Sequence, residues 1–110
     1  MPKPAPGEIW RVDLGLTAKV RPCLVMSDYP TEEELALVLM IPHTTAIRGN
    51  RWEFPCRKSF LRTGVFHLQQ IQPVSLNRLE AKLGALTTDE FRLLGRQLAT
   101  LLNLGTESRQ

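Results

Sequence analysis

The chain has 110 residues with 14 Lys and Arg against 11 Asp and Glu, a formal net charge of +3, and this length supports one hydrophobic core rather than two independent ones. The charge is compatible with a nucleic-acid partner without requiring one. Two cysteines exclude a disulfide scaffold, and no Cys/His spacing indicates a metal site, so we expect no metal ion or other cofactor. No secretion signal or membrane-spanning apolar run is recognisable, so we expect a cytoplasmic protein.

The first half of the chain predicts three strands. Three prolines disfavour regular structure in residues 1–6, which we expect to be a flexible N-terminal segment. Residues 8–14 alternate apolar and polar side chains, which is typical of a strand. Residues 22–27 predict a second strand, and residues 35–41, apolar throughout and ending at Pro42, predict a third that is buried.

The second half predicts further short strands. Residues 52–54 alternate like a brief strand, residues 64–72 form a longer one that ends at Pro73, and residues 81–86 form the last. One helical turn over residues 75–79 precedes this last strand. Six short strands separated by Pro and Gly favour a small antiparallel β-barrel.

The spacing of apolar residues changes at the C-terminal end from the alternation of a strand to that of a helix, which is predicted over residues 88–104. Thr87-Thr88-Asp89-Glu90 has the pattern of a capping box. Gly105 is expected to end the helix, leaving residues 105–110 as a tail. One helix face is apolar and formed by Phe91, Leu94, Leu98, Leu101 and Leu102, whereas Leu93 and Leu104 project to the other side.

Two strand ends carry residues suited to phosphate chemistry. Arg21 starts the second strand and offers a permanently charged fork that can hold a phosphodiester, and Thr44 follows the third strand with a hydroxyl donor. Taken singly, each residue also fits an ordinary strand end, where arginine is solvated and threonine caps a turn. Together they are typical of half of a metal-free nuclease site.

The order and spacing of several motifs resemble the MazF/PemK/Kid family, the toxins of bacterial toxin–antitoxin pairs. The resemblance covers Gly7 to about Leu104. It is carried by Gly7-Glu8-Ile9-Trp10-Arg11-Val12-Asp13, Arg21-Pro22-Cys23-Leu24-Val25-Met26-Ser27, Pro42-His43-Thr44-Thr45, Gln70-Ile71, Arg78-Leu79 and Gly84.

The resemblance implies an SH3-like barrel with a C-terminal helix, a toxin domain over residues 7–104 and a homodimer. It also implies a metal-independent, sequence-selective endoribonuclease that cleaves single-stranded mRNA and is inhibited by a cognate antitoxin. In such enzymes the 2′-hydroxyl of the RNA attacks the adjacent phosphorus. Arg21 matches the family's catalytic arginine and Thr44 its catalytic threonine.

The chain departs from the family at two places. Some relatives carry an arginine and an aspartate where this chain has His67 and Gln69, and His67 can act as an acid or a base near neutral pH whereas glutamine cannot. On a continuous strand His67 and Gln69 would share one face, opposite to Gln70. Many relatives also have a Gly-x-Glu element in the loop before Arg21, and residues 15–20 here contain no carboxylate.

Further residues are expected to bind substrate. These are Thr45, Arg48, Arg51, Gln69 and Gln70. The arginines fit either a phosphate-binding track or a solvated basic loop. Trp52 and Phe54 fit either base stacking or a core, and His43, on the strand face opposite Thr44, fits a structural role.

Two other functions remain open at this point. The same barrel supports CcdB-like toxins that bind gyrase without chemistry, for which the C-terminal helix would be the active surface. A catalytically degenerate family member, suggested by the missing loop carboxylate, would fold and bind antitoxin without cleaving RNA. Loss of toxicity on mutation of Arg21 and His67 distinguishes the nuclease from both.

Overall fold

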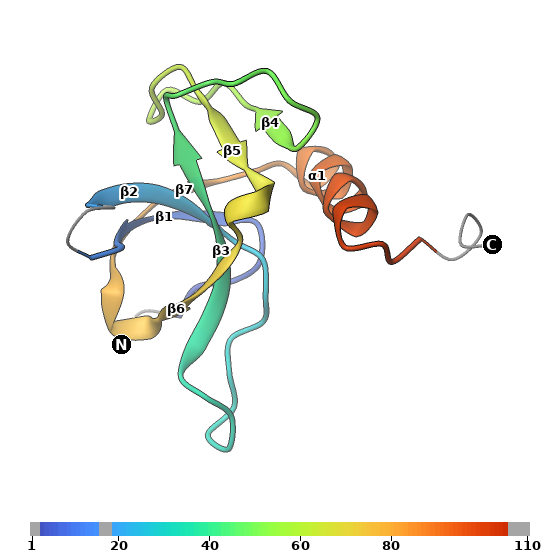
Figure 1. Ribbon diagram of the computed structural model, residues 1–110. Coiled ribbons are helices and arrows are strands. Elements are labelled where there is room, and N and C mark those ends of the chain that lie inside the picture. Colours follow the sequence, from blue (N-terminus) through green and yellow to red (C-terminus); the bar gives the residue numbers. More distant parts are fainter. Residues whose placement is uncertain (1–2, 16–18, 106–110) are drawn as a thin grey trace.

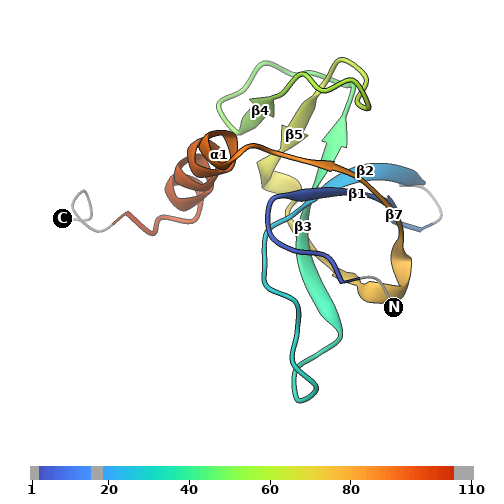
Figure 2. The same cartoon turned by 180° about the vertical axis from the view of Figure 1, so that it is seen from behind.

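The computed structural model describes residues 3–15 and 19–105, and in them a mainly antiparallel β structure leads into one helix (Figure 1; Figure 2 gives the view from behind). This confirms the fold class expected from the sequence. The elements are β1 (Glu8–Asp13), β2 (Val20–Val25), β3 (Leu37–Thr44), β4 (Glu53–Pro55), β5 (Val65–His67), the 3₁₀ turn η1 (Leu68–Gln70), β6 (Gln72–Ser75), the 3₁₀ turn η2 (Leu76–Arg78), β7 (Leu79–Ala85) and α1 (Thr88–Leu101).

Strand β3 is the centre of the sheet. On one side it pairs with β2, which continues through β1 to β7, and on the other it pairs with β6 along its first half and β5 at its end. Strand β4 then pairs with β5. Because β6 runs through η2 directly into β7, the sheet β7-β1-β2-β3-β6 closes on itself along the chain, which produces the rounded barrel seen in Figure 1.

Both faces of the central strands are buried, which explains their continuous apolar runs. One core cluster fills the barrel and contains Val12, Cys23, Val25, Val38, Met40, Val74, Leu76 and Leu79. The other lies between the sheet and α1 and contains Ile9, Leu24, Ile41, Phe66, Leu68, Leu86 and Leu94. Neighbouring residues therefore serve different cores: Met40 packs inside the barrel and Ile41 packs toward the helix.

The prediction that β3 stops at Pro42 is wrong, because the strand continues to Thr44. Pro42 pairs with Cys23 of β2, but on the other side of β3 the ladder to β6 ends at Met40 and the ladder to β5 begins at His43. Proline lacks the N–H that a ladder needs, and it lies here between two ladders where no residue of β5 or β6 opposes it.

The predicted strand over residues 64–72 is interrupted, and Pro73 lies within β6 instead of ending the strand. Phe66 pairs with His43 and Gln72 pairs with Met40. The first two residues are six positions apart in the chain, whereas their partners on β3 are only three apart. The additional residues form η1. Pro73 is tolerated because, in the described part of the chain, β6 pairs only with β3 and so is an edge strand.

Helix α1 begins as predicted and ends earlier than predicted. Thr87 and Glu90 form the reciprocal capping box, but the last helical residue is Leu101 rather than Leu104. Asn103 adopts a left-handed conformation (φ 63°), its N–H bonds to the Thr100 carbonyl, and the next N–H bonds to the Ala99 carbonyl. This is a Schellman ending with asparagine in the position usually taken by glycine.

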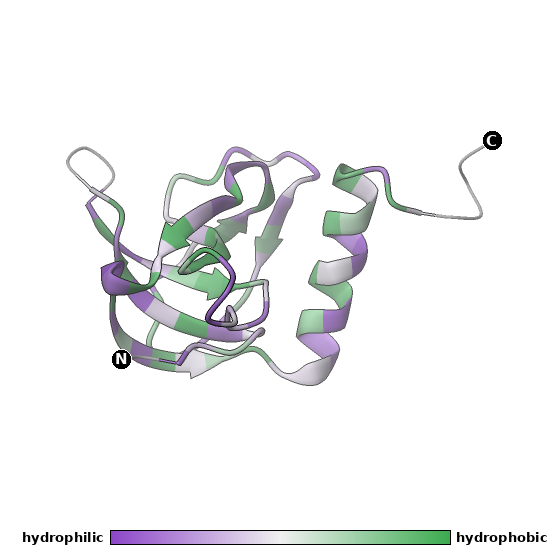
Figure 3. Ribbon diagram, turned by 90° about the horizontal axis from the view of Figure 1, so that it is seen from below, coloured by the Kyte–Doolittle hydropathy of each residue, from purple (hydrophilic) through white to green (hydrophobic). Residues whose placement is uncertain are grey.

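The apolar face of α1 covers the second core cluster, and Figure 3 shows from below how the helix lies alongside the β structure. Leu94 is fully buried, and Phe91, Leu98 and Leu101 pack at the edge of that cluster. Leu102, which was predicted on the same face, lies past the helix end and is 48 % exposed. No helix in the described residues is long and apolar enough to cross a membrane.

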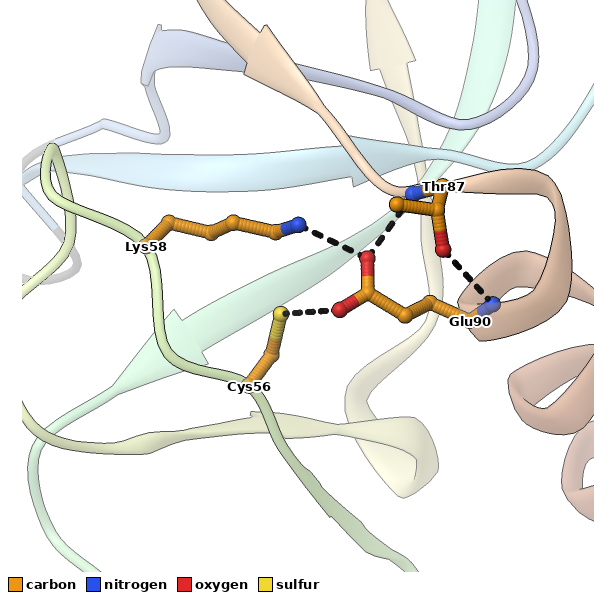
Figure 4. A network of polar contacts seen from close by, with 4 residues as sticks. All are labelled: Cys56, Lys58, Thr87 and Glu90. Carbon is orange, nitrogen blue, oxygen red and sulfur yellow. Dashed lines mark hydrogen bonds and ion pairs between the residues drawn. The ribbon is translucent and has the colours of Figure 1, made fainter.

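A polar network ties the start of α1 to the β4–β5 connection (Figure 4). Glu90 accepts hydrogen bonds from the Thr87 main-chain N–H and from Lys58 Nζ, each at 2.8 Å, and the Cys56 thiol donates to its other carboxylate oxygen. The ion pair with Lys58 is the largest cause that lowers the pKa of Glu90. Burial, followed by the nearby Glu90 carboxylate, raises the pKa of Cys56.

Candidate active site

A hollow of about 350 Å³, called here the central hollow, brings together residues from β2, β3, β5 and β6 and from the segments that follow β1, β3 and β5. Its lining contains all three residues predicted to be catalytic, Arg21, Thr44 and His67, and two of the predicted substrate-binding residues, Arg48 and Gln70. Leu14, Pro42, Ala46 and Gln72 complete it. These positions come from distant parts of the sequence, and the sheet order makes them neighbours.

Arg21 is anchored at one side of the central hollow by the pairing of β2 with β1, in which it lies opposite Val12. Its Nη1 donates to the main-chain carbonyl oxygen of His43 at 3.4 Å, so the guanidinium lies across the end of β3. The side chain is half-buried, and its charge is permanent. Such a group can stabilise negative charge on a phosphate.

Thr44 is the last residue of β3 and lies beside this guanidinium in the lining. Its Oγ1 accepts a hydrogen bond from the Ala46 N–H at 3.1 Å, which orients the hydroxyl. A hydroxyl that accepts one bond still has its own proton to donate. Thr44 is therefore suited to donating to a phosphate oxygen.

His67 ends β5 and lines the same hollow. Both ring nitrogens are buried, and neither has a hydrogen-bond partner in residues 3–15 and 19–105. Buried polar atoms without partners are uncommon because their desolvation is not compensated. A proton-carrying ring whose nitrogens are uncommitted fits a position where a substrate supplies the missing contacts.

Interruption of the predicted strand at η1 changes where the glutamines lie. The expectation that His67 and Gln69 share a strand face is wrong, because Gln69 and Gln70 belong to the 3₁₀ turn. Gln70 lines the central hollow and Gln69 is exposed outside it. Gln72, which sequence reasoning missed, also lines the hollow and donates to the Gln70 carbonyl oxygen at 3.1 Å.

Other predicted residues lie elsewhere. Thr45 does not line the central hollow but a second one on the other side of β3. Arg51 stacks on the ring of Trp52, with its guanidinium carbon 4.3 Å from the ring centroid. It lines neither of these two hollows, nor the third one described below. Trp52 and Phe54 are half-buried and pack at the edge of the core cluster under α1.

Glu53 is an important residue that the sequence reasoning missed. It is 9 % exposed, and its carboxylate accepts hydrogen bonds from the main-chain N–H of Arg48 at 2.7 Å and of Gly49 at 2.8 Å. These bonds, that to Arg48 above all, lower the pKa of Glu53. The residue holds the β3–β4 connection that carries Arg48 into the hollow, and a carboxylate between two aromatic residues was its only sequence signal.

A third hollow, of about 670 Å³, lies between the β3–β4 and β4–β5 connections and is larger than the central one. It is lined by the basic residues Arg57, Lys58 and Arg62 together with apolar residues such as Ile47 and Leu61. None of the predicted catalytic residues lines it. Among the described residues no group of His, Cys, Asp and Glu could hold a metal ion.

Comparison with known proteins identifies the fold. Residues 5–102 match the model of a family described as the PemK-like, MazF-like toxin of type II toxin–antitoxin systems. No curated protein sequence matches the chain. A solved mycobacterial endoribonuclease in complex with its cognate antitoxin superposes with a TM-score of 0.78 at 26% identity, covering 94% of this chain and 98% of that one.

Two further solved structures have the same fold. An endoribonuclease from a mycobacterial species superposes with a TM-score of 0.75 at 25% identity, covering 94% of each chain. A MazE–MazF structure from Deinococcus radiodurans gives a TM-score of 0.76 at 21% identity, covering 93% of this chain and 97% of that one.

Proposed function

The chain belongs to the family of PemK-like, MazF-like toxins of type II toxin–antitoxin systems, and we propose that it is an endoribonuclease that cleaves single-stranded RNA without a metal ion. The observation that carries this proposal is the meeting of Arg21, Thr44 and His67 at one hollow. A fixed cation, a hydroxyl donor and a titratable ring are the groups that this reaction needs.

In the proposed reaction the substrate supplies its own nucleophile. The 2′-oxygen forms a bond to the adjacent phosphorus, the bond from phosphorus to the 5′-oxygen breaks, and the products carry a 2′,3′-cyclic phosphate and a 5′-hydroxyl. The 2′-hydroxyl loses one proton and the leaving oxygen gains one, so the balance requires no oxidant and no added water. The protein has to stabilise the charged phosphorane and move the proton.

Each residue has a separate role in this scheme. Arg21 stabilises the additional charge on the phosphorane, because its guanidinium is held in place before the substrate binds. Thr44 donates its hydroxyl proton to a non-bridging oxygen. His67 carries the proton, since its ring nitrogens have no partner within the described part of the chain.

Gln70, Gln72 and Arg48 contribute binding in the same scheme. The two glutamines offer amide donors and acceptors that suit the sugar or a base edge. Arg48 adds a second positive charge at the rim, on a connection that Glu53 holds. The loop residues 16–18, where some relatives carry the Gly-x-Glu element, lie outside the described residues.

The proposed partners are RNA, a cognate antitoxin and a second copy of the chain. The solved mycobacterial relative was crystallised with its antitoxin, which supports inhibition by a partner protein here. A homodimer is proposed on the family resemblance. Cleavage of mRNA and inhibition by the antitoxin together would make this chain the toxin of its pair.

Incubation of the purified protein with a long single-stranded RNA in excess EDTA tests the proposal, with chemical mapping of the product ends. We expect discrete cuts with 5′-hydroxyl ends, lost in Arg21→Ala and strongly reduced in Thr44→Ala and His67→Ala. Arg96→Ala, which removes an exposed charge from α1, is the matched control and should cut normally. Intact RNA at high protein concentration would contradict the proposal and favour a binding toxin or an inactive family member.

A further inference from the structure

A second hollow, of about 410 Å³, lies beside the central hollow and has no assigned role in the chemistry above. The two are separated by the end of β3: Pro42 and Thr44 line the central hollow, whereas the residue between them, His43, lines the second. Alternation of side chains along a strand produces this division. The remaining lining residues are Lys19, Val20, Arg21, Pro22, Thr45, Phe60 and Arg62.

The second hollow is positively charged. It has three basic side chains, Lys19, Arg21 and Arg62, and none of the described residues that line it is acidic. Two of these cations are shared with neighbours: Arg21 also lines the central hollow, and Arg62 also lines the third hollow. The arginines thus mark a continuous path for a polyanion past the proposed cleavage site.

His43 adds an uncommitted polar atom to this hollow. The side chain is 4 % exposed, its ring meets the edge of Phe66 with centroids 5.1 Å apart, and its Nε2 has no hydrogen-bond partner in residues 3–15 and 19–105. Burial, and then the Arg21 charge, lower the pKa of His43, so the ring is neutral at pH 7. A neutral imidazole has one donor and one acceptor, which suits the edge of a base better than a phosphate.

Phe60 provides an aromatic surface in the same lining. Its ring packs on the backbone of β7 at Gly84, where an added Cβ would lie 2.5 Å from Phe60 Cε2. The ring is therefore held firmly by a residue that has no side chain. Unpaired bases of single-stranded RNA are commonly held against such rings.

We propose that the second hollow is a subsite for the nucleotide next to the scissile phosphate, with its base against Phe60 and facing His43, and its outer phosphate at Arg62. This rests on the proposed nuclease function and adds to it a specificity-determining position. Arg21 then lies between two bound nucleotides. The cations suit either an RNA phosphate or an acidic peptide, but a neutral buried imidazole beside an aromatic ring favours a nucleotide.

Short RNA oligonucleotides shortened one nucleotide at a time from each side of the mapped cleavage site test the subsite. For the wild-type protein we expect removal of one flanking nucleotide to lower kcat/KM by about tenfold. In Arg62→Ala and His43→Gln the complete substrate should be cut more slowly, and the same truncation should then make little difference. Arg96→Ala should retain the full truncation penalty.

Mapping of cut sites on a long RNA adds a readout that general damage to the fold would not produce. His43→Gln should relax or change the base preference at one position beside the cut, whereas Arg62→Ala should weaken cleavage at all sites and reduce its salt dependence. Both variants would first be checked for cooperative thermal unfolding, because His43 is buried.

The two proposals fail in different ways. If the wild-type protein cuts RNA but both variants keep its truncation penalty and its cut-site preference, the subsite is wrong and the nuclease stands. If Arg62→Ala weakens binding of the antitoxin alone, the hollow is a protein-binding surface and the subsite is again wrong. If the wild-type protein cuts no RNA, the proposed nuclease function itself fails.

Discussion

Glu53 and His67 lie opposite each other in the antiparallel ladder between β4 and β5. The carboxylate of Glu53 accepts the main-chain N–H groups of Arg48 and Gly49, while the His67 ring lines the central hollow. The same short ladder thus positions the proposed proton carrier and, through the carboxylate, the connection that brings Arg48 to the rim. Glu53 lines the third hollow rather than the central one, so it acts on the proposed reaction through its neighbours: it anchors the connection that carries Arg48, and its charge interacts with His67.

Glu53→Gln is expected to impair cleavage without removing a group that touches the substrate. The variant replaces one of the two carboxylate oxygens by an NH2 group, which donates and cannot accept a hydrogen bond. One of the two main-chain N–H groups then loses its acceptor, and the β3–β4 connection loses part of its anchor. We expect a lower Tm and a raised KM with a smaller change in kcat. Glu80→Gln, at an exposed ion pair with Arg11, is the control and should change neither value much. A normal KM in Glu53→Gln would contradict the positional role.

The network around Glu90 predicts a pH dependence of stability at both extremes. The pKa of Glu90 is lowered, mainly by Lys58. The ionised carboxylate therefore contributes to the free energy of unfolding above pH 4.5, the ordinary pKa, and this contribution is lost as the pH falls through the lower pKa of the folded protein. The pKa of Lys58 is raised, mainly by Glu90, so that contribution is present below 10.5 and is lost as the pH rises through the higher folded value.

Urea unfolding of the wild-type protein and Glu90→Gln at several pH values tests this coupling. The difference in unfolding free energy between the two proteins should be largest near neutral pH and should shrink in acid and in alkali. Asp89→Asn, at an exposed pair with Arg92 in the first turn of α1, is the neighbouring control. A difference that is constant with pH would contradict the network seen in Figure 4.

His43 predicts a separate loss of stability below neutral pH. The pKa of His43 is lowered in the folded protein. As the pH falls through the ordinary value of 6.5, His43 is therefore protonated in the unfolded chain before it is protonated in the folded one. The free energy of unfolding should therefore decrease from about pH 6.5 downwards until the folded pKa is reached. His43→Gln should lack this part of the pH profile, and an unchanged profile would show that His43 titrates normally.

Two glycines provide a matched test of packing at the site. An added Cβ at Gly64 would lie 2.2 Å from the Thr44 carbonyl oxygen and 2.7 Å from His43 Cε1. At Gly95 in α1 an added Cβ would meet no described atom within 4 Å other than its chain neighbours and the backbone of its own helix. We expect Gly64→Ala to lower the unfolding free energy by about 1–3 kcal/mol, because the added methyl group overpacks the space against Thr44 and His43. Gly95→Ala should raise it by about 0.5–1 kcal/mol, since glycine is a poor helix former.

The same pair separates stability from activity. Gly64→Ala should also reduce RNA cleavage at temperatures well below its Tm, because the displaced backbone carries Thr44. Gly95→Ala should cleave normally. Full activity of Gly64→Ala would mean that the end of β3 shifts without consequence for the reaction.

Much of the fold followed from local patterns in the sequence. The two-residue period of residues 8–14 marked β1, and the capping box marked the start of α1, because both signals come from neighbouring residues. The apolar run of residues 35–41 marked β3 because both faces of that strand are buried. The helix end was misplaced because Asn103, and not Gly105, takes the left-handed conformation.

The details of the site depended on pairing between distant strands, which no local pattern records. Pro42 could remain in β3 only because two ladders meet beside it, and residues 64–72 were divided because β3 is shorter than the chain that pairs along it. The division moved Gln69 away from the central hollow and left Gln70 and Gln72 in it. The role of Glu53 was missed because its carboxylate binds main-chain N–H groups of the β3–β4 connection. Such groups leave no distinctive pattern in the sequence.

The three residues Pro42, His43 and Thr44 form a wall only one backbone thick between two hollows. Inserting or deleting a single residue in this stretch would exchange the sides on which the following side chains lie, turning the imidazole toward the place of the hydroxyl. Most substitutions here would alter one hollow, but a change of length would alter both at once. The length of this segment is therefore as strongly constrained as its composition, and related chains should differ here by replacement and not by insertion or deletion.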